Sequence, residues 1–155
     1  LLESAQERFW KKVDKNGPRP TYRPELGRCW IWLGCLTTGG YGYFRSGKRI
    51  TRVHRWSYKN IKGPIPFGLE LDHLCRVPAC VNPRHLEPVT HRQNVLRGNG
   101  LAAQNARKTH CKWGHPLSGE NLRYDHYGKR QCFLCGNGLR RKRRLTRERN
   151  LTQPA

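Results

Sequence analysis

Residues 71–94 read Leu-Asp-His-Leu-Cys-Arg-Val-Pro-Ala-Cys-Val-Asn-Pro-Arg-His-Leu-Glu-Pro-Val-Thr-His-Arg-Gln-Asn. Within this stretch, His73 has a side chain that takes up a proton near neutral pH. Asp72 precedes it and Asn94 ends the stretch, and their side-chain oxygens suit Mg²⁺. The sequence therefore predicts a proton acceptor beside a site for a hard divalent cation.

Two cysteines and a histidine lie between these residues. The spacing Cys75-x₄-Cys80-x₄-His85 is typical of zinc ligands. Three ligands do not complete a closed tetrahedral site, so Cys29 or Cys35 is expected to supply the fourth. A disulfide or an ordinary loop is the alternative.

A second cysteine and histidine group follows in the C-terminal third of the chain. There, Cys111-x₃-His115 precedes Cys132-x₂-Cys135, and two short ligand pairs joined by a longer loop suit a closed zinc site. His110 competes with His115 for the histidine position. Free buried thiols are the alternative to a metal site.

Cysteine usage also bears on the compartment. The chain has seven cysteines, and an odd number in short-spaced clusters favours zinc over a disulfide framework. The sequence has no apolar run of transmembrane length, and its first residues lack the apolar core of a signal peptide. We therefore expect a cytoplasmic protein without a membrane partner.

The charge of the chain indicates its class of partner. Lys and Arg number 31 and Asp and Glu number 10, which gives a net charge of +21 over 155 residues. So positive a chain favours nucleic acid as the partner. The hydrophobic fraction is 35%, which is low for a folded chain, so metal sites are expected to add to the stability of a small core.

Hydrophobic pattern and turn residues predict a mixed set of elements. Thr90 and Gln93 form a capping-box pattern at a helix start, and Gly98 is expected to end that helix. Residues 100–109 are expected to be a polar linker. The other expected elements are a helix in 1–13, a strand in 29–34, a hairpin of 41–45 and 49–53, a short helix in 54–59, a strand in 69–73 and a small hairpin within 122–130.

Basic residues gather in two segments that are expected to bind DNA. A two-stranded ribbon fits a major groove, whereas the alternative for the C-terminal run is a solvated charged tail. The hairpin contributes Arg45, Lys48, Arg49 and Arg52, and the tail contributes Arg140, Arg141, Lys142, Arg143 and Arg144. Arg52, Arg55 and Arg97 are further candidates for contact with a reacting phosphate.

The pattern from His73 to Leu86, with Asn94 after it, resembles the HNH endonucleases, specifically the small HNH proteins common in bacteriophages. It is also similar to the His-Cys box homing endonucleases of the same ββα-metal superfamily. The similarity extends from Phe9 to about Cys135 and includes Cys29-Trp30-Ile31-Trp32, Tyr41-Gly42, Val53-His54-Arg55-Trp56 and Gly63-Pro64-Ile65-Pro66.

The resemblance implies a role for each matching residue. His73 would be the general base, and Asp72 and Asn94 would bind one catalytic Mg²⁺ or Mn²⁺. His85 stands where many HNH enzymes have a central Asn, so the role of that Asn does not transfer to this chain. In the His-Cys box pattern this His binds zinc with the two preceding cysteines and an upstream cysteine, a position that Cys29 matches best.

Together these observations predict an α+β fold: a small zinc-containing ββα-metal nuclease with an N-terminal β-hairpin region and a C-terminal zinc module. The expected regions are 1–60 for DNA contacts, 61–100 for the catalytic core, 101–138 for the zinc module and 139–155 for the basic tail. The expected partner is double-stranded DNA, with a homodimer and phage packaging proteins left open. The expected location is the host cell cytoplasm if the gene is a phage gene. A DNA-binding protein with two zinc ions and no catalysis is the alternative, and nicking is not distinguished from double-strand cleavage.

Overall fold

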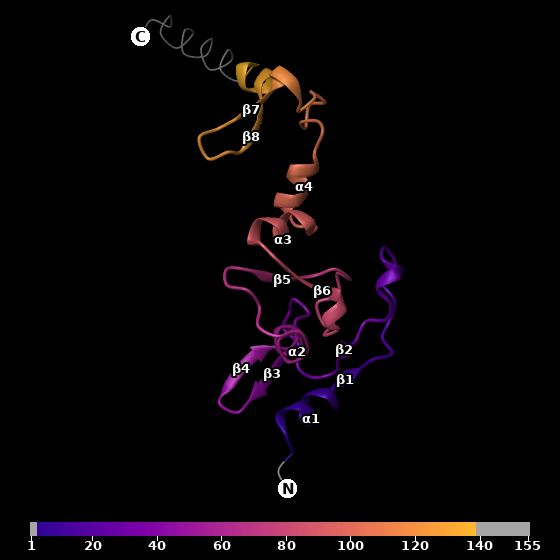
Figure 1. Cartoon of the computed structure of the whole chain (residues 1–155). Coiled ribbons are helices and arrows are strands. Elements are labelled where there is room, and N and C mark those ends of the chain that lie inside the picture. Colours follow the sequence, from indigo (N-terminus) through magenta and orange to yellow (C-terminus); the bar gives the residue numbers. More distant parts are fainter. Residues whose placement is uncertain (1–2, 139–155) are drawn as a thin grey trace, which may run out of the picture. The chain divides into compact units, whose positions relative to one another are not determined.

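The computed structural model describes residues 3–138 (Figure 1). The chain divides into two compact units, residues 1–98 and 99–155, and each is described by itself. The first contains α1 (Ala5–Trp10), β1 (Val13–Asp14), η1 (Pro24–Leu26), β2 (Ile31–Trp32), β3 (Tyr43–Ser46), β4 (Arg49–Arg52), α2 (Val53–Lys62), β5 (Glu70–His73), η2 (Pro83–His85), β6 (Leu86–Val89) and α3 (His91–Arg97). The second contains α4 (Leu101–Arg107), η3 (Gly119–Asn121), β7 (Leu122–Tyr124) and β8 (Arg130–Cys132). The mixed α and β content confirms the expected class.

The core of the first unit is largely aromatic. A capping box of Ser4 and Glu7 begins α1 and so fixes the position of Phe9, which is fully buried. The Phe9 ring stacks on Trp56 of α2 with 4.0 Å between ring centroids. The other buried members of this cluster are Trp32, Phe44, Val53 and Val81. Large rings thus supply much of the buried area in a chain that is poor in aliphatic residues.

A glycine permits the close approach between the hairpin and this core. A Cβ at Gly42 would lie 2.4 Å from Cδ1 of Trp32 and 2.8 Å from Cγ2 of Val53, so no larger residue fits without movement. The Gly42 carbonyl also accepts a hydrogen bond from the Val53 amide, at 3.1 Å. This contact joins the β3–β4 hairpin to the start of α2.

Two antiparallel strands and a helix follow α2 in sequence. β5 pairs with β6 from Glu70 opposite Val89 to His73 opposite Leu86. Leu71 and Leu86 pack with Tyr58 of α2, which places the pair on that helix. Thr90 then caps α3 with Gln93, and Gly98 ends it, as the sequence predicts. The consequence is that α3 runs along β5: His91 and Asn94 contact Glu70 at the start of the strand, and Arg97 at the end of the helix lies 3.6 Å from Asp72.

The structure differs from the sequence-based expectation in two segments. Residues 100–109 are not a linker, because α4 occupies most of them and buries Ala103. The segment has Ala at three positions, and the high helix propensity of Ala outweighs its polar neighbours. The second difference is β6, which is not among the strands expected from the sequence pattern. Its Pro88 lies on a two-stranded pair, where one strand edge needs no amide donor.

The second unit contains the predicted small hairpin. β7 pairs with β8 from Leu122 opposite Cys132 to Tyr124 opposite Arg130. The turn has Gly128 at φ +73°, a conformation that glycine adopts without strain. This hairpin brings Cys132 close to the segment that begins at Cys111. Among residues 3–138, no helix has the length and apolarity that crossing a bilayer requires.

Candidate active site and metal clusters

His73 lies at the end of β5 and is buried, with 7% of its surface exposed. Its Nε2 lies 3.1 Å from the carbonyl oxygen of Cys80. A carbonyl only accepts, so Nε2 carries the proton and Nδ1 keeps its lone pair. Burial lowers the pKa of His73 below its usual value, which favours the neutral ring. The imidazole is therefore neutral, and its Nδ1 lone pair can accept a proton.

Asp72 precedes His73 and is almost fully buried. Its Oδ1 forms an ion pair with Arg76, and its Oδ2 has no hydrogen-bond partner although it lies 3.6 Å from Nη1 of Arg97. Arg97 itself is bound at 2.5 Å to Glu87. Two arginines therefore compensate the charge of this buried carboxylate, and Oδ2, which has only the longer contact, is the oxygen with capacity left for a further cation.

Asn94 comes from α3, and its side chain turns back to β5 as expected. Its Nδ2 donates to Oε2 of Glu70 at 2.7 Å, which leaves the amide oxygen as the atom available to a cation. Asp72, His73 and Asn94 line one cavity of about 180 Å³. The donor set of a carboxylate oxygen and an amide oxygen fits Mg²⁺ or Mn²⁺.

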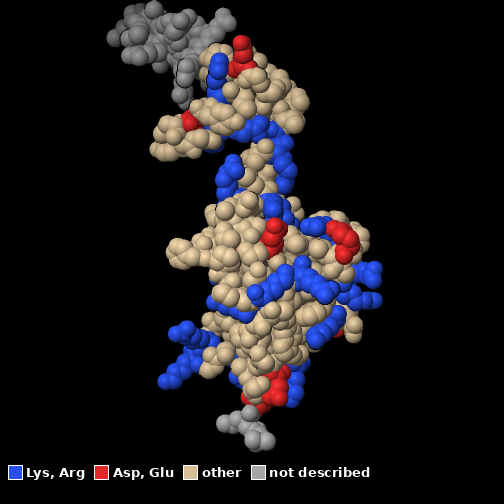
Figure 2. Space-filling view, viewed as in Figure 1, with Lys and Arg blue, Asp and Glu red and all other residues tan. Residues whose placement is uncertain are grey.

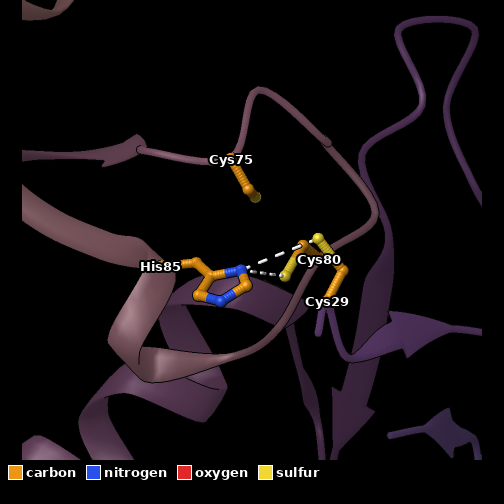
Figure 3. A group of neighbouring side chains, drawn as sticks. All are labelled: Cys29, Cys75, Cys80 and His85. Atoms are coloured by element: carbon orange, nitrogen blue, oxygen red, sulfur yellow. Dashed lines mark hydrogen bonds between the residues drawn. The ribbon is translucent and has the colours of Figure 1, made fainter. Parts of the chain in front are cut away.

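A first cysteine and histidine cluster includes Cys80, whose carbonyl oxygen lies next to the His73 ring. Figure 3 shows the side chains of Cys29, Cys75, Cys80 and His85 turned toward one another. All four are buried, and their ligand atoms lie within 4.8 Å of one another. The Nδ1 of His85 is 3.6 Å from both Cys29 Sγ and Cys80 Sγ. Ligands of tetrahedral zinc lie about 3.3 to 3.8 Å apart, as metal–ligand distances of about 2.0 to 2.3 Å require, so the cluster fits zinc.

Local hydrogen bonds explain why Cys29, and not Cys35, joins this cluster. Ile31 forms a bridge with Cys80, and the Val81 amide donates to the Trp30 carbonyl at 2.7 Å. These bonds bring the segment around Cys29 against the Cys80 loop, whereas Cys35 is exposed. The Nε2 of His85 donates to the Leu26 carbonyl at 2.8 Å, which directs Nδ1 at the cluster.

The thiols of this cluster cannot all ionise together without a cation. A hydrogen bond from Cys80 lowers the pKa of Cys75 to about 5. Burial and the neighbouring Cys75 raise the pKa of Cys29 to about 11, and the hydrogen bond with Cys75 raises the pKa of Cys80. One thiolate is thus stabilised at the expense of the others. A divalent cation would compensate several thiolates at once.

The second cluster comprises Cys111, His115, Cys132 and Cys135, with ligand atoms within 4.8 Å of one another. The Nδ1 of His115 is 3.2 Å from Cys135 Sγ and 3.5 Å from Cys111 Sγ. His110 is not part of it, because its Nδ1 interacts with the Thr109 hydroxyl at 3.0 Å. The structure brings both predicted ligand sets together.

The basic residues of the hairpin lie on the surface. Figure 2 shows Lys and Arg side chains gathered at the end of the β3–β4 hairpin, at the lower left, and Arg45, Lys48 and Arg49 are exposed there. Arg52 lies over the rings of Tyr41 and Tyr43. Arg52 and Arg55 line a cavity with Asn94. The predicted basic tail, Arg140 to Arg144, lies outside the described residues.

Comparison with known proteins indicates the family of the central segment. The model of a family described as HNH endonuclease matches residues 51–96. This segment is similar to the HNH endonuclease family. The HNH segment includes Asp72, His73 and Asn94, and it ends before the second cysteine and histidine cluster.

Two phage proteins are similar to the chain around this HNH segment. The "Uncharacterized gene 5.3 protein" of Enterobacteria phage T3 is 36% identical over 66 residues, which are 37% of this chain and 65% of that protein. "Protein 7.7" of Escherichia phage T7 is 33% identical over 66 residues, which are 43% of this chain and 51% of that protein. The chain thus spans about half to two thirds of the length of these relatives. No solved structure matches the chain.

Sequence reasoning missed three neighbours of the HNH site. Glu70 orients Asn94, Arg76 binds Asp72, and the ring of His54 lies 4.8 Å from the ring of His73. The sequence contained a signal for Glu70. Residues 70 and 72 are two positions apart on one predicted strand, so their side chains point to the same face as the predicted site. Arg76 adopts φ +54°, a conformation that a sequence pattern does not reveal for a residue other than glycine.

Proposed function

We propose that the protein is a metal-dependent DNA endonuclease that hydrolyses phosphodiester bonds. The observation that supports this most strongly is the shared cavity of Asp72, His73 and Asn94 in a segment similar to the HNH endonuclease family. In this proposal β5, β6 and α3 form the ββα-metal unit. The general base is His73 at the end of β5, and the metal ligand on the helix is Asn94.

His73 takes a proton from the attacking water. Its Nδ1 is the free nitrogen because Nε2 is bound to the Cys80 carbonyl, and its neutral state is favoured by burial. The water attacks phosphorus in line with the leaving 3′-oxygen. The proton moves from the water to Nδ1, the bond between phosphorus and the 3′-oxygen breaks, and the 3′-oxygen takes a proton from solvent water. A phosphate at the 5′ end and a hydroxyl at the 3′ end are the products that the resemblance implies.

Asp72 and Asn94 are the residues that would hold one Mg²⁺ or Mn²⁺ ion. When bound, such an ion neutralises the charge that develops on the phosphoryl group and the leaving oxygen. The Oδ2 of Asp72 and the amide oxygen of Asn94 would be the donor atoms. Arg76 and Arg97 also balance the charge of Asp72, because a buried carboxylate needs a cationic partner.

The two cysteine and histidine clusters are proposed as structural zinc sites. Each offers four protein ligands, and a closed set of four is typical of structural zinc, whereas catalytic zinc keeps a position open. The first site orders the loop that contains the Cys80 carbonyl. The second site supplies stability to a unit in which few apolar side chains are buried.

Loss of one ligand should remove zinc from the second site alone. We expect Cys132→Ser to bind one zinc ion per chain where the wild type binds two, and to unfold residues 99–138 at lower temperature, because zinc supplies folding free energy there. Metal content by mass spectrometry and circular dichroism measure both effects. Cys35→Ser changes a cysteine outside the clusters and is the control. A Cys132→Ser protein with two zinc ions would contradict this assignment.

The β3–β4 hairpin is proposed to bind the DNA backbone. We expect a triple Arg45→Ala, Lys48→Ala and Arg49→Ala variant to reduce the slope of log K against log salt concentration by roughly 2 to 3, since each phosphate contact contributes about 0.9. Fluorescence anisotropy of a labelled duplex at several salt concentrations gives this slope. A triple Lys11→Ala, Lys12→Ala and Arg19→Ala variant is the control, because it removes the same charge outside the hairpin. Equal losses in both would point to net charge and not to the hairpin.

Cleavage of supercoiled plasmid in Mg²⁺ at low salt tests the proposed function. Conversion to open circles or linear DNA supports the nuclease, and the ratio of the two products distinguishes nicking from the paired cleavage that a homodimer would perform. Binding without cleavage by the wild type would favour the alternative function, a DNA-binding protein with two zinc ions. Cleavage only after addition of phage packaging proteins would show that a partner is required.

A further inference from the structure

His54 is a buried histidine that the proposed mechanism does not use. It lies in the first turn of α2 with 7% of its surface exposed. Its Nδ1 is buried and has no hydrogen-bond partner. Such a nitrogen destabilises the folded state relative to an apolar ring of the same size. The imidazole at this position therefore calls for an explanation other than packing.

The ring of His54 lies against the proposed base. The centroids of the His54 and His73 rings are 4.8 Å apart with an interplanar angle of 69°, and the ring of Tyr41 is 5.8 Å from each. This edge-to-face arrangement is a favourable contact between rings. His54 is therefore adjacent to the residue that would accept the proton from water.

His54 also borders an opening next to the Asp72 cavity. It lines a cavity of about 420 Å³ together with Arg52, Arg55 and Asn94. Tyr41, Leu71 and Asn94 line this cavity and the one that contains Asp72 and His73, so the two adjoin. Two arginines on its wall suit a phosphate group. A DNA backbone that reaches Asn94 would thus pass His54.

The charge state of His54 limits what it can do in this cavity. Burial and the neighbouring His73 and Arg55 lower the pKa of His54 to about 3, so the ring is neutral near pH 7. A buried N–H without an acceptor is rarer than a buried lone pair without a donor, which assigns the lone pair to Nδ1 and the proton to Nε2. The neutral ring then offers one N–H group to a ligand.

We propose that His54 is a further catalytic residue, a neutral hydrogen-bond donor whose Nε2–H contacts a non-bridging oxygen of the scissile phosphate. The inference rests on the nuclease function proposed above. A neutral donor stabilises the phosphoryl oxygen without placing a second positive charge beside His73 when that residue takes up its proton. A lysine or arginine at this position would repel the protonated base.

Substitutions that separate the ring from its N–H group test the proposal. His54→Phe keeps a ring against His73 and removes the donor, whereas His54→Gln keeps an amide N–H near the position of Nε2. We expect His54→Phe to lower kcat about 10- to 100-fold, as loss of a hydrogen bond to a charged group predicts, with the KM for DNA within about twofold. His54→Gln should recover part of this loss. Tyr58→Phe, on the same helix and outside both cavities, is the control.

Two further measurements complete the experiment: thermal unfolding of His54→Phe and NMR spectra of His54 in the wild type. His54→Phe should unfold at the same temperature as the wild type or higher, because it removes an unpartnered nitrogen. Long-range ¹H–¹⁵N NMR spectra of the wild type with a short duplex and Ca²⁺ should show His54 protonated on Nε2, with a resonance that shifts when DNA is added. A His54→Phe variant that cleaves within twofold of the wild type, or a His54 signal that DNA leaves unchanged, would overturn the proposal.

These outcomes separate the proposal from the nuclease function. A shift of the His54 signal in a wild-type protein that cleaves no DNA would reject the nuclease, and with it the catalytic role of His54, and would leave only a contact between His54 and DNA. Cleavage by the wild type with an unchanged His54 signal would support the nuclease and reject the role of His54.

Discussion

We expect His73→Ala to abolish DNA cleavage while DNA affinity and zinc content stay within about twofold of the wild type. The substitution removes the nitrogen that accepts the proton from water, and general base catalysis contributes about 10² to 10⁴ in rate. The other groups that contact phosphate remain, so binding is retained. Rates of supercoiled-plasmid cleavage and anisotropy of a labelled duplex measure the two properties on the same preparation.

The control for this experiment is His126→Ala, which removes an exposed histidine from a turn of the second unit. It should cleave at the wild-type rate. Equal cleavage by His73→Ala and the wild type would indicate a contaminating nuclease or a different base. Loss of DNA binding together with cleavage would mean that His73 has a structural role, because its ring bonds to the Cys80 loop.

We expect Cys80→Ser to destabilise the first unit severely. Cys80 is fully buried, and Ser is a poor ligand for zinc, so the variant should lose the metal of the first cluster. Structural zinc supplies roughly 10 to 16 kcal/mol of folding free energy in zinc-finger peptides. A loss of only about 3 kcal/mol would lower the melting temperature by about 12 to 24 °C in a unit of this size.

Metal content and thermal unfolding test this expectation, with Cys35→Ser as the matched control because Cys35 is exposed and lies outside both clusters. The Cys80→Ser protein should keep one zinc ion, at the second cluster. It should also lose cleavage, since the loop that orients His73 would be disordered. A Cys80→Ser variant that melts with the wild type would remove the first zinc site from the proposed structure.

The parts of the site that lie close together in sequence were predictable. Cys75, Cys80 and His85 have the spacing of metal ligands, and the capping box at Thr90 fixed the start of α3, so the direction of Asn94 followed from helix geometry. Motifs of this kind depend on local backbone conformation, which the sequence reports directly.

Other features depend on contacts between distant segments and were not accessible in the same way. Spacing alone left Cys29 and Cys35 as alternatives, and the family resemblance favoured Cys29. The structural reason is the pairing of Ile31 with Cys80, which no local pattern indicates. His54 lies beside His73 because α2 packs under β5 and β6. The helix α4 was not predicted, because the polar residues of 100–109 indicated a linker, whereas its three alanines favour a helix.

The partner of His73 Nε2 is a main-chain carbonyl, that of Cys80. No change of side chain at position 80 deletes this acceptor, because every amino acid has the same carbonyl group. Scanning by single substitutions would therefore assign the effect of position 80 to its thiol and overlook the oxygen that fixes the tautomer of the base. Only backbone chemistry, such as replacement of the amide by an ester or of the carbonyl by a thiocarbonyl through protein semisynthesis, would reveal that contribution.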